Sequence, residues 1–364
     1  MFSKGEQQHY HRQLILDEIG ESGQARLKDA KVLVIGAGGL GSAILPYLAA
    51  AGVGHVGIID HDTVATSNLH RQVMFGMDDV GKNKAVTAAG KLSQLNPHIG
   101  ITSYPEALTS GNAGMLFSGY DIIVDGSDNF PTRYLVNDAA VMCGKPVVFG
   151  SIFKFEGQVS VFNYMDGPTY RCLFPEPPLP GTSPNCSEIG VLGVLPGIIG
   201  TLQANEVIKI ICGIGEVLRG KLFTIDCLSL QTQVLRFKKT VFEIPETLQD
   251  TGYDCNFAPE DLEITPEQLS KSLPEESVLI DVRTHTEREK YTISSVINGP
   301  DDIHIPLDEL MSRDQDIPEN KHLIFYCQSG IRSLQAVRTY LQKYPLAKVS
   351  SVKGGLNAVL NSVN

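Results

Sequence analysis

The stretch KVLVIGAGGLGSAILPYLAAAG, residues 31–52, constrains the fold of this chain more than any other. It reads as a buried strand, a glycine turn and a helix, and Gly36, Gly38 and Gly41 give it the spacing G-x-G-x-x-G. Such glycines let the backbone turn tightly and approach a phosphate, which the N-terminus of the following helix stabilises. Asp60 closes the next apolar run, where a carboxylate can accept hydrogen bonds from a ribose. These features predict a Rossmann-like nucleotide site, and a dehydrogenase is its usual interpretation.

Apolar runs and helical segments alternate along the first 240 residues. HVGIID, DIIVDGSDN and PVVFGSI have strand character, and GVLPGIIGTLQANEVIKIICG reads as a largely buried helix. This alternation predicts an α/β fold with a mostly parallel sheet. GQVSVFNY alternates more regularly, which favours an antiparallel strand. Residues 174–187 form a Pro-rich loop, and long irregular loops in compact domains tend to be functional or disordered.

A second α/β unit begins near residue 262. Its segments SVLIDVR, KHLIFYCQSG and RSLQAVRTYLQKY again alternate short apolar strands with helices. The unit is long enough for a small domain, and 364 residues suit about two domains. We therefore predict a large first domain over 1–245, a linker over 246–261 and a small second domain over 262–364.

Composition excludes several classes of protein. No apolar run approaches the ~20 residues that span a bilayer, and the N-terminus lacks the apolar core of a signal peptide. A net charge of −11 argues against non-specific nucleic-acid binding. The seven cysteines are scattered and odd in number, so they indicate catalytic, metal-binding or buried thiols rather than a disulfide framework. We expect a cytoplasmic protein without a membrane or nucleic-acid partner.

Polar residues beyond Asp60 change the interpretation of the nucleotide site. Asn68 and Arg71 follow it closely, Lys84 comes next, and Asp128 lies at the end of another strand. Two cations and a second acid have little use in hydride transfer. They suit a triphosphate, because cations offset phosphate charge and a carboxylate can hold Mg²⁺. Taken singly, each cation could equally be a solvated surface residue, and Asp128 a helix cap.

Together, GAGGLG, the stretch from Asp60 to Gln72, Lys84 and DGSDN resemble the HesA/MoeB/ThiF family of ubiquitin-activating-type adenylyltransferases, over about residues 9–240. The resemblance implies ATP-dependent adenylation of the C-terminal glycine of a ubiquitin-fold sulfur-carrier protein that ends in Gly-Gly. It implies that Asp128 lies near Mg²⁺. HYHRQLIL resembles the family's N-terminal segment, which implies a homodimer in which Arg12 reaches the partner's ATP site. The implied nucleotide-binding set is Arg12, Gly36, Gly38, Gly39, Gly41, Asp60, Ser67, Asn68, Arg71, Lys84, Asp128 and Asn129.

The chain departs from this family at a metal site. Relatives often have two C-x-x-C pairs that bind a structural zinc. Here Cys172 and Cys255 remain, but Thr169 and Gly252 stand where the first cysteine of each pair would be. Two thiolates do not complete a four-coordinate structural site. We therefore predict that the chain holds no structural zinc.

Cys327 in FYCQSGIRS follows a strand and precedes a helical run. Successive backbone N–H groups and a helix N-terminus at such a point favour the thiolate, Gly330 permits a tight curl, and Arg332 adds positive charge. With DVR and VKGGLNAV, this segment resembles a rhodanese domain over about residues 262–360, which implies that Cys327 bears a persulfide. The family's usual Trp after the Gly-Gly segment is missing, and Ala358 or Val359 stands there.

Cys186 lies in the Pro-rich loop. The resemblance implies that this loop crosses over the ATP site, where Cys186 would attack the acyl-adenylate or resolve an acyl-persulfide. The alternative is a buried strand-end cysteine for Cys327 and an incidental exposed cysteine for Cys186. The remaining Cys143, Cys212 and Cys227 fall in apolar patterns and are predicted to lie in the core.

The resemblance as a whole implies an enzyme that adenylates a carrier and then supplies sulfur from a persulfide donor, giving a thiocarboxylate for molybdopterin, thiamine or a similar pathway. Its catalytic residues would be Cys186, Cys327, Arg71, Asp128 and Arg332. Two alternatives stay open. One is an NAD-dependent oxidoreductase with a regulatory rhodanese module, and the other is a non-catalytic binder of a ubiquitin-like protein.

Overall fold

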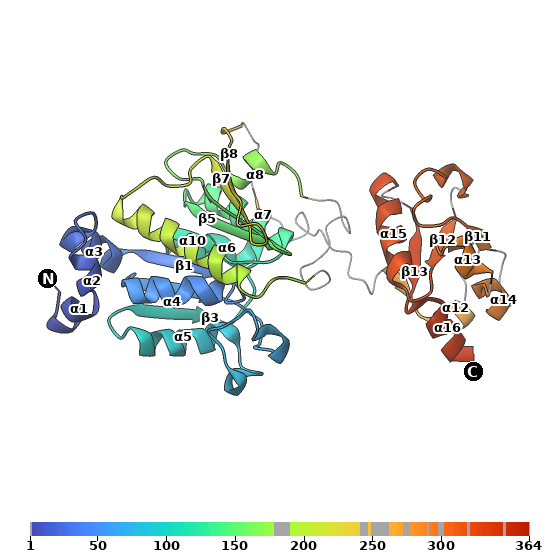
Figure 1. Ribbon diagram of the computed structural model, residues 1–364, viewed down its shortest axis with the longest axis horizontal. Helices are drawn as coiled ribbons and strands as arrows, with labels where there is room; N and C mark the ends of the chain where they lie inside the picture. The colour runs from blue at the N-terminus through green and yellow to red at the C-terminus, as the bar shows by residue number, and fades with distance from the viewer. Residues whose placement is uncertain are drawn as a thin grey trace. The chain divides into compact units, whose positions relative to one another are not determined.

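The structure is a computed structural model, and it describes residues 2–177, 190–240, 247–248, 262–271, 277–289, 291–297, 302–318, 321–344 and 347–363. The chain forms two compact units, each with its own sheet (Figure 1). The predicted α/β class of both units is confirmed. The exact domain bounds stay a prediction.

The first unit is built on an eight-stranded sheet of order β3-β2-β1-β4-β5-β6-β7-β8. The pairs from β3 to β5 are parallel, whereas the pairs from β5 to β8 are antiparallel. The antiparallel strand expected from GQVSVFNY is therefore confirmed as β6. The strands are β1 Lys31–Ile35, β2 His55–Ile59, β3 Gly100–Tyr104, β4 Ile122–Asp125, β5 Val147–Phe153, β6 Glu156–Phe162, β7 Lys221–Asp226 and β8 Thr232–Arg236.

Helices cover both faces of this sheet, because the parallel strands are apolar on both sides. Val32 and Val34 of β1 belong to the core cluster that includes residues of α4, α5 and α10, while Leu33 and Ile35 belong to the cluster formed with α6, α7 and α8. Helices α4 and α10 pack directly against each other (Figure 1). The helices are α1 Lys4–His9, α2 His11–Leu14, α3 Gly20–Asp29, α4 Gly41–Ala51, α5 Lys84–Leu95, α6 Ser110–Ser118, α7 Phe130–Met142, α8 Tyr170–Leu173 and α10 Leu195–Cys212.

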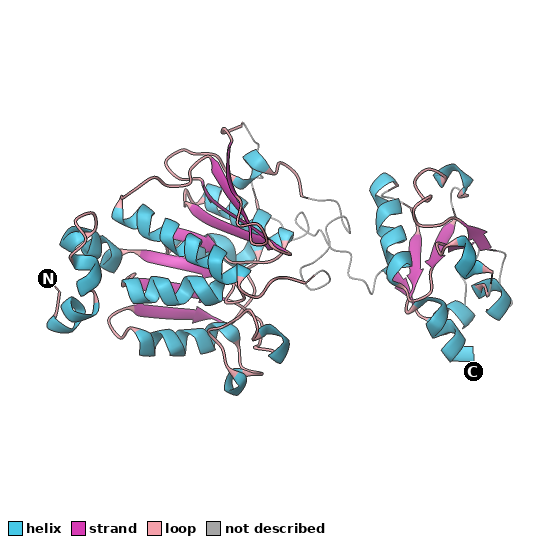
Figure 2. Cartoon of the chain, in the orientation of Figure 1, coloured by secondary structure: helices cyan, strands magenta, loops and turns pink. Residues whose placement is uncertain are grey.

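The second unit has a five-stranded parallel sheet of order β11-β10-β12-β13-β9. Helix α15 packs on one face through Val337 and Tyr340, and α12, α14 and α16 contribute to the cluster on the other face (Figure 2). Val359 is buried in that second cluster, where the family's Trp is missing. The elements are β9 Glu263–Ile264, α12 Pro266–Lys271, β10 Ser277–Asp281, α13 His285–Arg288, α14 Ile293–Ile297, β11 Asp302–His304, β12 His322–Tyr326, α15 Ile331–Lys343, β13 Val349–Val352 and α16 Gly355–Val363.

The three cysteines predicted for the core differ in burial. Cys212 is fully buried at the end of α10, as expected. Cys143 and Cys227 are half-buried and pack against the edges of the two clusters. Among the described residues, no helix is long and apolar enough to cross a membrane.

Candidate functional site

The glycine turn between β1 and α4 is shaped by close backbone approach. Gly36 has φ +88°, a conformation that L side chains rarely adopt. A Cβ at Gly41 would lie 2.2 Å from the carbonyl oxygen of Gly36, so helix and strand can meet here without a side chain between them. A Cβ at Gly39 would lie 3.1 Å from Pro196 of α10. Gly36 is thus required by conformation and Gly41 by space, whereas Gly39 leaves only a tight contact with Pro196.

Asp60, at the carboxyl end of β2, is held by two backbone donors. Its Oδ2 accepts from the N–H of Ala37 in the glycine turn, and its Oδ1 accepts from the N–H of Asp62, each at 2.8 Å. Burial raises the pKa of Asp60, although these two bonds and the charge of Lys84 oppose it. Each carboxylate oxygen has two lone pairs, so both retain capacity for a ribose hydroxyl.

Arg71 and Asn68 lie together after β2. The guanidinium donates to Asn68 Oδ1 at 2.8 Å and to the carbonyl oxygen of Ser67 at 3.2 Å. A guanidinium has five N–H donors, so Arg71 keeps donors for phosphate oxygens. Gln72 is buried next to the glycine turn, and its Oε1 has no hydrogen-bond partner among the described residues.

Lys84 is the first residue of α5, and its side chain is only 7% exposed. Its Nζ pairs with Asp62 Oδ2 at 2.7 Å. Burial alone would raise the pKa of Asp62, but the hydrogen bond from Lys84 and its positive charge outweigh burial and lower this pKa. The interpretation of Lys84 as a solvated surface cation is therefore wrong. Asp62 itself was not among the predicted site residues, although it stands two positions after Asp60.

Asp128 and Asn129 follow β4, at the same edge of the sheet as the glycine turn. Asn129 is the N-cap of α7, because its Oδ1 accepts from the N–H of Thr132 at 2.9 Å. The interpretation of Asp128 as that cap is therefore wrong. Its side chain is exposed, without a hydrogen bond or ion pair among the described residues. It is thus available to a metal ion or a ligand.

Two buried charges support this turn, and the sequence analysis missed both. Asp125 ends β4, and its Oδ1 accepts from the N–H and the hydroxyl of Ser127 at 3.0 and 2.6 Å. Burial raises the pKa of Asp125, against the charge of Arg133 on α7. Arg133 is buried over the rings of Phe130 and Phe149. A polar residue at the end of an apolar run was the one signal in the sequence for Asp125.

Two predicted residues receive less support from this geometry. Arg12 lies on α2 and is exposed. Ser67 is exposed too, and the structure gives its backbone carbonyl, rather than its hydroxyl, as the acceptor for Arg71 and His70. Their roles stay predictions.

Cys327 stands directly after β12, and its side chain is fully buried. Its Sγ accepts from the N–H of Gly330 at 3.2 Å and from the hydroxyl of Ser333 at 3.6 Å. Gly330 has φ +88° and is the N-cap of α15. The predicted curl around the thiol is therefore confirmed. Arg332 instead forms a two-point ion pair with Glu287, a residue that the sequence analysis did not single out.

The structure describes only two of the four positions at which relatives bind zinc, Thr169 and Cys172. Cys172 Sγ accepts from the N–H groups of Thr169 at 3.3 Å and Thr240 at 3.4 Å. Burial raises the pKa of this thiol, but the hydrogen bonds outweigh it and lower the pKa. Cys255 and Gly252 lie outside the described residues, as does Cys186. The absence of zinc and the role of Cys186 stay predictions.

Comparison with known proteins gives two family matches. Residues 10–242 match the ThiF family, and residues 265–362 match the rhodanese-like domain. The sulfur carrier protein adenylyltransferase of Thermus thermophilus is 52% identical over 243 residues, which cover 65% of this chain and 90% of that protein. The probable adenylyltransferase/sulfurtransferase MoeZ of Mycobacterium tuberculosis is 41% identical over 378 aligned positions, covering 98% and 93% of the two chains.

Solved structures share the fold of the first unit. The microcin C7 biosynthetic enzyme MccB in complex with N-formylated MccA is 26% identical, with a TM-score of 0.54 over 61% of this chain and 69% of that one. PaaA is 23% identical, with a TM-score of 0.56 over 66% and 76% of the two chains, and shows the fold alone. The family matches cover the glycine turn, the Asp60–Gln72 stretch and the Cys327 loop. The chain therefore belongs to the ThiF family and has a rhodanese-like domain after its ThiF domain.

Proposed function

We propose that this chain is an adenylyltransferase with sulfurtransferase activity. It uses ATP to adenylate the C-terminal glycine of a ubiquitin-like sulfur carrier, and it then delivers sulfur from Cys327 to form a thiocarboxylate. One observation supports this most: Arg71 lies next to Gly39 of the glycine turn, and the buried Lys84 and the exposed Asp128 follow parallel strands that end at the same edge of the sheet, in a chain that also has a curled thiol loop. Adenylyltransferase and sulfurtransferase are also the activities named for its relatives.

The adenylation step needs positioning and charge neutralisation more than covalent catalysis. An oxygen of the carrier's terminal carboxylate attacks the α-phosphorus of ATP, and the bond to pyrophosphate breaks. The N–H groups of the glycine turn face the phosphates, Asp60 accepts from the ribose, and Arg71 offsets phosphate charge. Lys84 is already buried and paired with Asp62, so its ammonium costs little further desolvation when a phosphate approaches.

The donor set at this edge of the sheet fits Mg²⁺. Asp128 offers an exposed carboxylate that has no hydrogen bond or ion pair to any residue that the structure describes, and Mg²⁺ prefers oxygen ligands together with substrate phosphates. We propose that Asp128 holds the ion, which when bound neutralises charge on the phosphates. The side chain of Asn129 is occupied as the N-cap of α7, and this contact fixes the backbone next to Asp128.

In the sulfur step, the terminal sulfur of a Cys327 persulfide attacks the carbonyl carbon of the acyl-adenylate, and AMP leaves. The resulting acyl-persulfide is resolved when a thiolate attacks the Cys327 sulfur, which gives a disulfide and releases the carrier thiocarboxylate. We propose Cys186 for this thiolate, or alternatively for direct attack on the acyl-adenylate. A persulfide donor then reloads Cys327 after the disulfide has been reduced by a cellular thiol.

We further propose a cytoplasmic homodimer in which Arg12 reaches the partner's ATP site. The exposure of Arg12 in the single chain supports this, because a cation that serves a neighbouring subunit must be free at the surface. The pathway supplied is that of molybdopterin, thiamine or a related sulfur-containing cofactor.

Carrier-dependent exchange of pyrophosphate into ATP tests the first step. We expect exchange with a carrier that ends in Gly-Gly, none when its last glycine is deleted, and a strong loss in Asp128→Ala. Intact mass of the carrier after incubation with ATP and a sulfur source should show the adenylate and then replacement of one oxygen by sulfur. Stabilisation by NADH but not ATP in a melting experiment would instead support the oxidoreductase alternative. Undiminished exchange in Asp128→Ala would contradict the assigned metal role.

A further inference from the structure

Arg332 of the Cys327 loop is not a free cation. Its two terminal nitrogens donate to the two carboxylate oxygens of Glu287, at 2.8 and 2.7 Å. This two-point geometry is the strongest arrangement between a guanidinium and a carboxylate. The pair lowers the pKa of Glu287 to about 2, so Glu287 is charged throughout the physiological range. The positive charge that Arg332 brings to the thiol loop is therefore neutralised by Glu287.

Glu287 is held in this place from its own side. Its Oε2 also accepts from the N–H and the hydroxyl of Thr284, at 3.0 and 2.9 Å, in the capping box of α13. Its backbone carbonyl accepts from Arg283 at 3.2 Å. Glu287 can therefore not follow Arg332 freely, and it fixes where the guanidinium lies.

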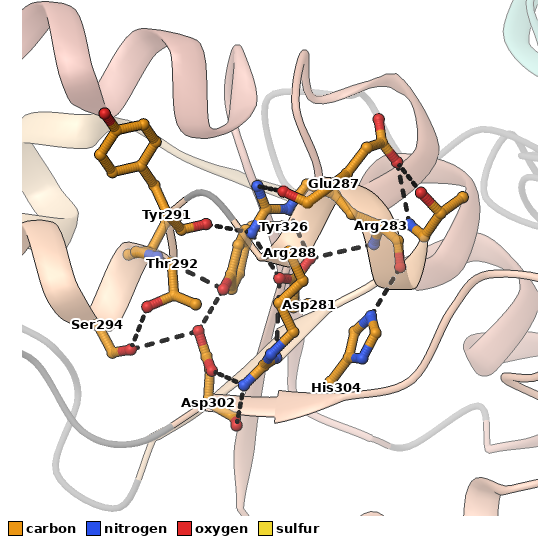
Figure 3. A network of polar contacts seen from close by, with 12 residues as sticks. Asp281, Arg283, Glu287, Arg288, Tyr291, Thr292, Ser294, Asp302, His304 and Tyr326 are labelled. Carbon is orange, nitrogen blue, oxygen red and sulfur yellow. Dashed lines mark hydrogen bonds and ion pairs between the residues drawn. The ribbon is translucent and has the colours of Figure 1, made fainter.

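Arg283 anchors this arrangement to the sheet. It is fully buried, and its guanidinium pairs with both carboxylate oxygens of Asp281 at 2.9 and 2.7 Å (Figure 3). It also donates to the carbonyl of Tyr291 at 2.6 Å and lies over the ring of Tyr326, the residue before Cys327. The contacts thus run from β10 through Arg283 and Glu287 to the loop that holds the thiol.

This arrangement sets the charge met by a sulfur donor. The ionisable groups that act on Arg332 are Glu287 of α13, Asp281 of β10 and the Cys327 thiol after β12. With Glu287 in place, Arg332 and its partner sum to zero charge. A neutral ion pair attracts a small dianion such as thiosulfate only weakly. A neutral or singly charged persulfide loses little binding energy when the cation is neutralised in this way.

We infer that Glu287 is a specificity-determining residue that positions and masks Arg332, so that Cys327 favours a persulfide donor of low charge over small dianions. The inference rests on the proposed sulfur transfer. In the favoured reaction, the Cys327 thiolate attacks the outer sulfur of an R–S–S⁻ donor, the S–S bond breaks, and RS⁻ leaves. With thiosulfate, the same attack on the sulfane sulfur releases sulfite.

Glu287→Gln in the full chain tests the masking, since it removes the charge and keeps the shape. We expect kcat/KM with thiosulfate to rise about tenfold, because one unmasked cation about 6 Å from a dianion is worth about that much at the dielectric constant of water. Activity with glutathione persulfide should change less than about twofold. Glu289→Gln removes the same charge from an exposed residue two positions on and should change neither. The gain should vanish in Glu287→Gln/Arg332→Gln.

A second readout separates this inference from the proposed function. Peptide mass spectrometry measures alkylation of Cys327 by neutral iodoacetamide and by anionic iodoacetate across pH. Unmasking Arg332 should raise the iodoacetate-to-iodoacetamide rate ratio in Glu287→Gln even if the chain transferred no sulfur at all. An unchanged ratio in a folded Glu287→Gln would overturn the inference, as would equal losses with both donors. If Glu287→Gln does not fold, Glu287→Asp, which keeps the charge at a shorter reach, should show a smaller increase of the same ratio.

Discussion

Gly41→Ala tests whether the nucleotide site depends on the close approach of α4 to β1. The φ angle of Gly41 is not positive, so the backbone itself accepts alanine. Space is the obstacle, because the new Cβ would lie 2.2 Å from the carbonyl oxygen of Gly36 and 3.0 Å from its carbonyl carbon. Both of those atoms belong to the backbone of the turn, so no side chain can rotate away.

The expected cost follows from these distances. Ordinary contact begins at 3.4 Å, so helix and turn must separate by about 1 Å. Overpacking of this kind destabilises the fold by about 1–3 kcal/mol. Alanine in place of glycine offsets about 0.5–1 kcal/mol of this, because it lowers the conformational entropy of the unfolded chain. We expect a net loss of about 1–2 kcal/mol in the free energy of unfolding. A displacement of about 1 Å in the phosphate-binding turn should lower carrier-dependent exchange about a hundredfold.

Chemical denaturation and pyrophosphate exchange measure the two effects on the same preparations. Gly90→Ala is the matched control, because Gly90 lies inside α5 with nothing within 4 Å of a new Cβ. It should raise the free energy of unfolding by about 0.5–1 kcal/mol and leave exchange unchanged. If Gly41→Ala kept the wild-type KM for ATP and the wild-type exchange rate, then close helix–strand packing would not position the phosphates.

Three further changes test other parts of the chain. Cys327→Ala should abolish sulfur transfer and leave pyrophosphate exchange intact, and loss of both would contradict separate roles for the two units. If the proposed dimer forms, Arg12→Ala should raise the KM for ATP without dissociating it in light scattering, and a fully active monomer would refute the shared site. In Glu6, hydrogen bonds from Lys28 and Ser3 lower the pKa to about 2, so its stabilising contribution is complete above about 4.5 and is lost as pH falls toward 2. Glu6→Gln should therefore lower the melting temperature at pH 6 but have little effect at pH 2, and an equal loss at both would be inconsistent with this ion pair.

The fold could be predicted from the sequence where the pattern of apolar residues or the spacing of glycines is unambiguous. The strand at 31–35 and the helix that begins at Gly41 were both predicted because an apolar run met a G-x-G-x-x-G turn. The antiparallel pairing of β6 was predicted from its alternation of apolar and polar residues. The strand order could not be derived, because no local pattern specifies that β1 lies between β2 and β4.

The site was predicted where residues share a motif and missed where partners come from elsewhere in the chain. Asn68 and Arg71 stand three positions apart, so their contact is nearly local. Glu287 and Arg332 are 45 positions apart, and nothing in either segment indicates the other. Asp128 and Asn129 were treated alike in the nucleotide-binding set, yet backbone geometry gives the cap to Asn129 and leaves Asp128 free.

Both units use the same local device for different anions. In each, a parallel strand ends, a glycine at φ +88° turns the chain, and a helix begins: Gly36 before α4, and Gly330 before α15. Such a turn gathers backbone N–H groups at a helix N-terminus, where negative charge is stabilised. In the proposed function, a triphosphate would extend well beyond one turn, and Arg71, Lys84 and Asp128 would supply the further charges that it needs. A thiolate is a single compact charge, and the Gly330 N–H and the Ser333 hydroxyl already reach it, so an unmasked Arg332 is not needed to hold it. Under the inference above, neutralisation of Arg332 by Glu287 therefore changes the choice of donor without removing a contact that holds the thiolate.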